Sequence, residues 1–198
     1  MPRRLRRCGN LRAMSLEPDE FSAAPEAATP EPVRVLVPSQ LGNLGVEFLH
    51  TAISRVVFAP TGKEKQLFFP LSDYEDSDFL DEVFGRISEF FAGARKNLEL
   101  EYDLAPSGLD SFARRVLKEV SRTPYGKTRT YKEVAEAAGR PEAFRQVLSI
   151  VEKNPLPILI PCHRIVPTKS GIGNYVGGVA RKRWLLRMER ETLVATAG

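Results

Sequence analysis

The sequence predicts an α/β protein with a small N-terminal α/β domain and a C-terminal helical domain. Short apolar runs broken by Pro and Gly occupy residues 33–104, whereas amphipathic helical patterns follow from residue 109. The charge also changes sign: residues 1–106 hold 12 Lys and Arg against 17 Asp and Glu, and residues 107–198 hold 17 against 8. A basic C-terminal half suits contacts with phosphates, although solvated basic faces are common.

Residues 1–32 are expected to be a disordered extension ahead of two domains, at 33–106 and 107–192. The extension begins with arginines, becomes acidic and rich in Pro and Ala, and holds few large apolar residues. Its basic start could contact nucleic acid. A dispensable extension, with Met14 as an alternative start, fits equally well.

The N-terminal domain should contain three strands and one helix. The strands are Val33–Val37, Gly45–Leu49 and Ser54–Phe58, each rich in branched or aromatic residues. Residues Asp78–Phe91 form an amphipathic helical pattern. One side of that helix carries Phe79, Val83, Ile87, Phe90 and Phe91.

The C-terminal domain should begin with a helix from Leu109 that ends before Pro124, followed by two short helices. Thr130 can cap the first short helix, with Glu133 completing a capping box, and that helix runs to about Ala138. Pro141 suits the first position of the second, which runs to about Lys153. Two helices across a short glycine-containing turn have the outline of a helix-turn-helix.

Cysteine usage and hydropathy place the chain in a broad class. Its two cysteines lack the spacing of a disulfide framework, which indicates a reducing compartment. No apolar run approaches the length of a membrane span, and residues 1–16 lack the apolar segment of a secretory signal. We expect a soluble cytoplasmic protein without a membrane partner.

The segment around Cys162 is where the chemistry is expected. It places the only cysteine outside the extension beside His163, one of two histidines in the chain. A neighbour that stabilises the thiolate decides the reactivity of a cysteine, and His163 is such a neighbour. Adjacent side chains of an extended strand point to opposite faces, so His163 should not lie directly against the sulfur.

Three sequence blocks in this region resemble the O6-alkylguanine-DNA alkyltransferases, also called methylated-DNA–protein-cysteine methyltransferases. The blocks are Asn154-Pro155-Leu156-Pro157, Pro161-Cys162-His163-Arg164 and Gly173-Asn174-Tyr175-Val176-Gly177-Gly178. The resemblance covers residues 108–190 closely and 33–104 loosely. It implies a ribonuclease-H-like N-terminal domain and a winged helix-turn-helix-like C-terminal domain that binds the DNA minor groove and flips the damaged base out.

The same resemblance implies roles for five residues. Cys162 would accept the alkyl group from guanine O6, with His163 as its base through a bridging water. Glu189 would orient His163, on the helix face that also carries Lys182. Asn154 would be a hinge, and Tyr131 would contact the flipped guanine and its 3′ phosphate. By themselves, Glu189, Asn154 and Tyr131 would be an exposed glutamate, a helix stop and a helix-start aromatic.

The resemblance also implies substrate and DNA contacts. Arg145 would fill the space left by the extruded nucleotide, a role that suits a planar guanidinium, and Ser149 would face DNA. The main-chain amide of Val176 would face O6, within a glycine-containing loop that closes over the base. The expected substrate-binding residues are Tyr175, Val176, Gly177, Gly178, Ile165 and Lys182.

The recognition helix departs from the family pattern at Leu148, where the family has glycine. Helical spacing puts Phe144, Val147 and Val151 on the buried face and Leu148 at its boundary. Arg145, Ser149 and Glu152 form the outer face. Leu148 and Glu152 therefore put close approach to the groove in doubt.

No metal and no cofactor are expected, because the N-terminal region offers only Cys8 and His50, too few for a closed tetrahedral zinc site. The expected function is single-turnover repair of O6-alkylguanine in double-stranded DNA by a monomer, nucleoid-associated or nuclear according to the source. The main alternative is an alkyltransferase-like damage sensor, but those proteins carry tryptophan in place of Cys162. A Cys-His-Glu hydrolase would need an oxyanion hole that the sequence does not identify.

Overall fold

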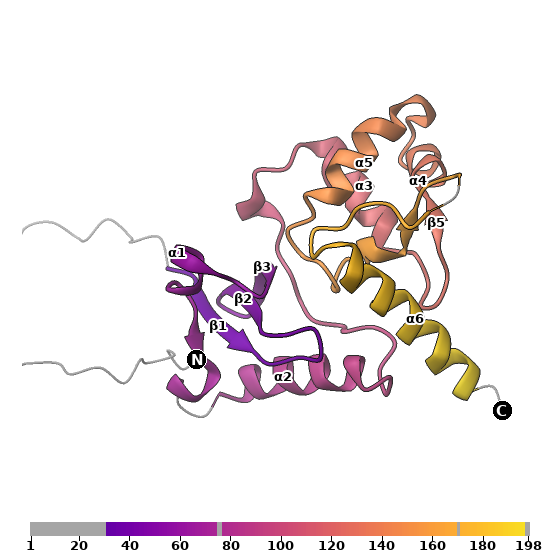
Figure 1. Ribbon diagram of the computed structural model, residues 1–198. Coiled ribbons are helices and arrows are strands. Elements are labelled where there is room, and N and C mark those ends of the chain that lie inside the picture. Colours follow the sequence, from indigo (N-terminus) through magenta and orange to yellow (C-terminus); the bar gives the residue numbers. More distant parts are fainter. Residues whose placement is uncertain (1–30, 75–76, 170, 197–198) are drawn as a thin grey trace, which may run out of the picture.

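The computed structural model describes residues 31–74, 77–169 and 171–196, which form an N-terminal sheet region and a C-terminal helical region (Figure 1). The extension expected at residues 1–32 lies almost wholly outside these described residues. Among the described residues, no helix has both the length and the apolar character needed to cross a membrane.

The N-terminal region is built on a four-stranded sheet in the order β3-β2-β1-β4. Strands β1 (Val33–Val37), β2 (Leu44–Leu49) and β3 (Ala52–Phe58) form an antiparallel meander, and β4 (Phe69–Pro70) runs parallel to β1. The three predicted strands are confirmed. The pattern did not reveal β4, because two residues that end in proline carry no alternation.

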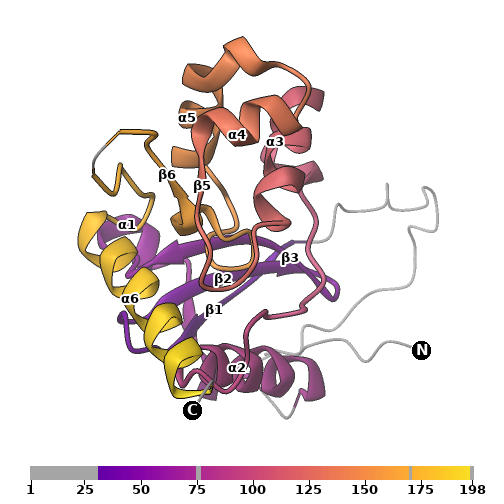
Figure 2. The same cartoon turned by 90° about the vertical axis from the view of Figure 1, so that its right-hand side faces the viewer.

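Helix α2 (Asp78–Phe91) has the predicted bounds and packs on the sheet. The Ser77 hydroxyl caps it by accepting from the Leu80 amide. Figure 2 shows α2 on the face of the sheet opposite α3, α4 and α5, with α6 reaching the end of α2. The buried side chains are Leu80, Val83, Ile87, Phe90 and Phe91. Phe79 is only half-buried and packs edge-on against Phe48 at 5.3 Å between ring centroids. Short helices α1 (Gly62–Lys65) and η1 (Leu71–Asp73) complete this region.

The linker between the two regions lies along β3. The Ile53 amide donates to the Glu101 carbonyl, and the Asp103 amide donates to the Ile53 carbonyl, both at 2.9 Å. A short turn, η2 (Ala105–Ser107), then leads into α3 (Ser111–Ser121). These bonds continue the sheet beyond its edge strand and fix where the C-terminal region begins.

A helix-turn-helix follows α3 and confirms that prediction. Strand β5 (Arg129–Thr130) enters α4 (Tyr131–Ala137), and the predicted capping box of Thr130 and Glu133 is present. The second helix begins later than expected, because residues Pro141–Ala143 form a 3₁₀ turn, η3, ahead of α5 (Phe144–Glu152).

The segment around Cys162 is a 3₁₀ turn, η4 (Cys162–Arg164), so the predicted extended strand is wrong at this point. The Arg164 amide donates to the Pro161 carbonyl at 2.9 Å and closes the turn. The strand starts only afterwards, as β6 (Ile165–Val166), parallel to β5. Helix α6 (Val179–Ala195) ends the described chain.

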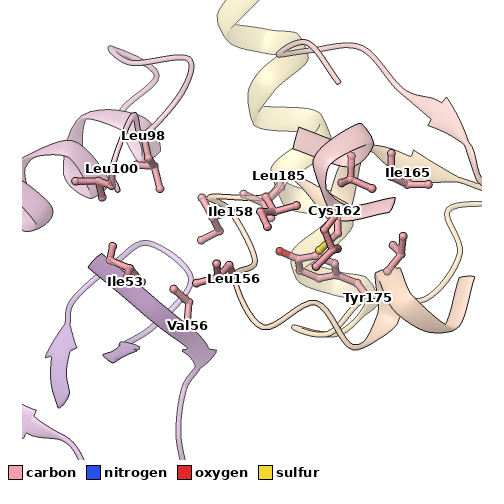
Figure 3. Close-up of a cluster of buried hydrophobic side chains, with 14 of the residues drawn as sticks. Ile53, Val56, Leu98, Leu100, Leu156, Ile158, Cys162, Ile165, Tyr175 and Leu185 are labelled. Carbon is pink, nitrogen blue, oxygen red and sulfur yellow. The ribbon is translucent and has the colours of Figure 1, made fainter. Parts of the chain in front are cut away.

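The two regions share one apolar core that continues across their junction. The Val56 amide of β3 donates to the Pro155 carbonyl at 2.8 Å. Figure 3 shows Ile53 and Val56 beside Leu156 and Ile158 of the segment that leads to Cys162. Strand β3 of the sheet therefore packs against the segment that leads to Cys162.

Candidate active site

Asn154 holds the segment between α5 and Cys162 in a closed loop. Its Nδ2 donates to the Ile160 carbonyl at 2.9 Å, and its Oδ1 accepts from the Leu156 amide at 3.1 Å. The side chain is 2% exposed, so water does not compete for these bonds. Within the loop, Ile158 adopts φ of 76°, a left-handed conformation that is uncommon for a branched residue and is held by burial.

The Cys162 side chain lies inside the protein, with no exposed surface. Figure 3 shows its sulfur beside Tyr175. Burial raises the pKa of the thiol to about 11, and this outweighs the opposing effects of the Asn154 hydrogen bond and the Lys182 charge. The resting side chain is therefore a neutral thiol.

His163 is paired with Glu189 inside the protein. Its Nε2 lies 2.8 Å from Glu189 Oε1, and both side chains are fully buried. Burial alone would raise the pKa of Glu189, but hydrogen bonds and charges from His163 and Arg164 outweigh this effect and lower the pKa below its usual value. The group is therefore a carboxylate. A carboxylate only accepts, so Nε2 carries the hydrogen and Nδ1 presents a lone pair.

The protonation state of His163 corrects the sequence prediction. Burial lowers the pKa of His163 despite the Glu189 carboxylate, so the ring is neutral at rest. A neutral imidazole does not stabilise a thiolate by charge. Its Nδ1 has no hydrogen-bond partner among the described residues and can act as a base.

Arg164 is a site residue that the sequence analysis missed. Its Nη2 donates to Glu189 Oε1 at 2.8 Å, its Nε contacts both carboxylate oxygens, and its Nη1 donates to the Thr123 carbonyl at 2.7 Å. The Gly126 amide also donates to Glu189 Oε2 at 2.8 Å. A buried glutamate requires such a cation. The signal was the arginine directly after His163.

Lys182 connects α6 to the loop that follows β6. Its Nζ donates to the Ile165 carbonyl at 2.6 Å and to the Asn174 carbonyl at 3.1 Å. Burial lowers its pKa to about 8, an effect that electrostatic interactions with Glu152 and with the ionised form of Cys162 partly oppose. Lys182 therefore holds both ends of the loop in place beside the thiol.

The loop at residues 175–178 covers the thiol from one side. Tyr175 is 8% exposed, and its hydroxyl has no hydrogen-bond partner among the described residues. A Cβ on Gly177 would come within 2.5 Å of the Phe58 ring, so only glycine fits there. Gly178 takes φ of 86°, and the Val176 side chain is exposed.

Tyr131 lies at the start of α4 and is almost fully buried. Burial raises the pKa of its hydroxyl to about 12, with smaller contributions from Glu152 and Cys162. The group therefore keeps its proton at neutral pH and can donate it. No described residue bonds to this hydroxyl.

The surface of α5 is separate from this buried group. Arg145 and Ser149 are exposed as expected, and Leu148 is half-buried at the boundary. Phe144 was predicted on the buried face, but its side chain is 45% exposed. That prediction fails because α5 begins only at Phe144, which places the ring beyond the core that receives Val147 and Val151.

The fold thus brings most of the predicted site residues into one buried cluster and leaves others on the surface. No group of three or more potential metal ligands occurs among the described residues. The buried cluster contains Cys162, His163, Glu189, Asn154, Tyr131, Tyr175, Gly177, Ile165 and Lys182. Val176, Gly178, Arg145 and Ser149 are exposed.

A helix-turn-helix lies beside a buried cysteine and a His-Glu pair. This arrangement is that of a DNA-binding protein whose candidate nucleophile is a thiol. Comparison with known proteins agrees. A family model described as the DNA-binding domain of 6-O-methylguanine DNA methyltransferase matches residues 111–191. The methylated-DNA–protein-cysteine methyltransferase of Methanosarcina barkeri is 35% identical over 130 residues, which cover 66% of this chain and 80% of the relative. The protein of that name from Archaeoglobus fulgidus is 39% identical over 135 residues, covering 65% and 86%.

Solved structures give the same result. The O6-methylguanine methyltransferase of Mycobacterium tuberculosis aligns with a TM-score of 0.70 and 27% identity, covering 82% of this chain and 94% of that one. The OGT of the same organism in complex with DNA aligns with a TM-score of 0.69 and 28% identity, covering 80% and 93%. This chain belongs to the methylated-DNA–protein-cysteine methyltransferase family.

Proposed function

We propose that this protein repairs DNA by direct reversal, moving an alkyl group from guanine O6 in double-stranded DNA to Sγ of Cys162. One observation carries the proposal: a fully buried thiol lies beside a neutral His163 whose Nε2 is held by the Glu189 carboxylate. The cluster is joined directly to a helix-turn-helix. The chain therefore combines a DNA-binding element with a nucleophile and its base.

Burial of Cys162 requires the damaged base to leave the duplex. A base inside the stack cannot bring its O6 to a sulfur with no exposed surface, so the nucleotide has to be extruded into the protein. Tyr175 and the loop containing Gly177 and Gly178 would enclose the base. The main-chain amide of Val176 would face O6, and Ile165 and Lys182 would hold that loop in position.

The transfer step balances in protons and electrons. His163 Nδ1 takes the thiol proton, directly or through one water, and Sγ attacks the alkyl carbon. The carbon–O6 bond breaks, and its electron pair stays on the purine. The purine takes up one proton, which matches the one that His163 received from the thiol, and becomes guanine. The Tyr131 hydroxyl donates to guanine N3 and eases this departure. Cys162 is left as a thioether, a poor leaving group, so each molecule acts once.

The surface of α5 would provide the DNA contacts. Arg145 would enter the minor groove and fill the space of the extruded nucleotide, and Ser149 would face the groove. Asn154 would act as the hinge between α5 and the thiol, since it bonds to both ends of the connecting loop. We propose that a monomer suffices and that it acts where DNA lies, in the nucleoid or the nucleus.

Intact mass spectrometry tests the proposal. The wild-type chain, incubated with a duplex containing O6-methylguanine, should gain one methyl group in place of one hydrogen, at Cys162 and once per molecule. Cys162→Ala should gain none and should still bind the duplex, whereas Cys8→Ser should behave as wild type. Tight binding without a mass change would indicate a damage sensor. Repeated turnover with an unmodified Cys162 would indicate a hydrolase.

A further inference from the structure

Phe144 is an exposed aromatic residue on the helix that is proposed to enter DNA. It is the first residue of α5, and its side chain is 45% exposed, whereas Val147 is fully buried. The guanidinium carbon of Arg145 lies 5.6 Å from the centroid of the Phe144 ring. A cation held against an aromatic face at this distance is attracted to it. The two side chains therefore form a pair, the Phe144–Arg145 pair, at one end of α5.

The position of this pair matters because of how helix-turn-helix motifs dock. The second helix of the motif enters a groove, and its N-terminal residues meet the bases. The helix α5 is that second helix, and Phe144 is its first residue (Figure 1). A large ring at this point is not needed for the core, which closes with Val147 and Val151.

Extrusion of a nucleotide creates a specific demand at this position. When a base leaves the stack, the neighbouring base pairs lose a stacking partner, and the duplex tends to close again. Apolar side chains such as Phe, inserted from the minor groove, separate base steps and hold them apart. A guanidinium can fill the vacated space, and an apolar ring next to it can cover the neighbouring base pair as well.

We propose that Phe144 is a positioning residue of the repair reaction, a wedge whose ring stacks on the base pair beside the extruded nucleotide while Arg145 occupies the vacated space. This inference rests on the proposed function. Phe144 has no part in the transfer step, because it lies on the exposed surface and the thiol is buried. Its effect is on the fraction of protein–DNA complexes in which the damaged nucleotide is extruded.

The test compares Phe144→Ala with Phe144→Leu, which keeps an apolar wedge. The matched control is Phe84→Ala, an exposed phenylalanine of α2 with 36% exposure, on the far side of the sheet from α5. Single-turnover transfer is measured with methylated duplex DNA and with free O6-benzylguanine, which needs no extrusion. Fluorescence of 2-aminopurine placed beside the lesion reports base unstacking.

The expected result is a selective loss. Phe144→Ala should slow transfer from the duplex roughly 5- to 100-fold, the equivalent of one base stack, and should lower the 2-aminopurine signal. Its rate with the free base should equal that of wild type, and Phe144→Leu should retain most of the duplex rate. A wild-type duplex rate in Phe144→Ala overturns the proposal, as does an equal loss on both substrates. A wild-type protein without transfer to Cys162 would instead overturn the proposed function.

Discussion

The buried cluster around Cys162 and the exposed surface of α5 are built in opposite ways. Cys162, His163, Arg164 and Glu189 are each at most 2% exposed, and Glu189 accepts from three different residues. On α5, Arg145 and Ser149 are exposed, and the Arg145 guanidinium lies over a ring that is itself half in solvent. The groups of the proposed chemistry are therefore in place before DNA arrives, whereas the proposed recognition relies on exposed side chains that are free to adapt.

This difference implies a separation of effects. A change to a hydrogen-bonded side chain of the cluster should alter stability and transfer together, because the same bonds carry both. A change to a fully exposed side chain of α5 should alter only reactions that involve duplex DNA.

The largest combined effect, on stability and on transfer, is expected from Glu189→Gln. The change removes the negative charge that pairs with the buried Arg164 and fixes the His163 tautomer. Breaking a buried pair on one side costs about 3–5 kcal/mol of unfolding free energy. Transfer should also fall by roughly 10²-fold, because His163 loses its orientation as a base.

Chemical denaturation and single-turnover assays measure both effects. The matched control is Arg190→Gln, at the next position of α6, whose side chain is exposed and which should change neither quantity. If Glu189→Gln kept full stability but lost transfer, the hydrogen bonds of the buried cluster would serve the reaction without stabilising the fold. The cluster and the α5 surface would then not differ in their effect on stability.

Tyr131→Phe should separate chemistry from stability within the buried region. The hydroxyl has no partner among the described residues, so its removal should not lower the melting temperature. One positioned proton donor contributes about 10²–10⁴-fold, and single-turnover transfer at saturating DNA should slow within that range. Tyr102→Phe, 40% exposed on the linker, is the control. An unchanged rate would remove Tyr131 from the mechanism.

Local patterns predicted most of the elements. The spacing of apolar residues predicted the bounds of α2, and the Thr130–Glu133 capping box is present as expected. Both depend on neighbours within one or two turns, which the sequence contains. The single turn at Cys162–Arg164 was predicted as a strand, since the five residues between Pro161 and Pro167 are too few to show a periodicity.

Long-range packing explains what the sequence could not reveal. The pKa values of Cys162 and His163 depend on complete burial, which α6 and the loop at Tyr175 create from distant positions. Arg164 became a site residue only when α6 brought Glu189 against it. Phe144 lies outside the core because it is the first residue of α5 and extends beyond the buried residues. Helical spacing alone does not show which turns of a helix pack against the core.

The ionisation of Cys162 gives a pH test of the buried state. Because burial raises its pKa to about 11, alkylation by iodoacetamide in a Cys8→Ser background should rise about tenfold per pH unit towards pH 11. In denaturant the profile should level off near pH 8.5. The pKa of Cys162 is higher in the folded chain, so the thiol of the unfolded chain loses its proton first as the pH rises. The free energy of unfolding should therefore fall between about pH 8.5 and pH 11. A folded profile that levels off below pH 9 would contradict the buried thiol.

The smallest effect is expected from Leu148→Gly, on the exposed side of the comparison. Leu148 is half-buried against the core, at the edge of the surface that is proposed to face DNA. Removing its side chain should tighten binding to duplex DNA, because the α5 backbone can then approach the groove more closely. Stability should fall by about 1 kcal/mol from the helix-interior glycine, plus the lost apolar contact.

The matched control is Ser149→Gly, which adds the same glycine cost at the next, exposed position. Fluorescence titration of a labelled duplex at fixed salt, with thermal melts of all variants, separates the two contributions. Weaker binding by a folded Leu148→Gly would show that the leucine supports the interface, and the α5 surface would then be more firmly organised than its exposure indicates.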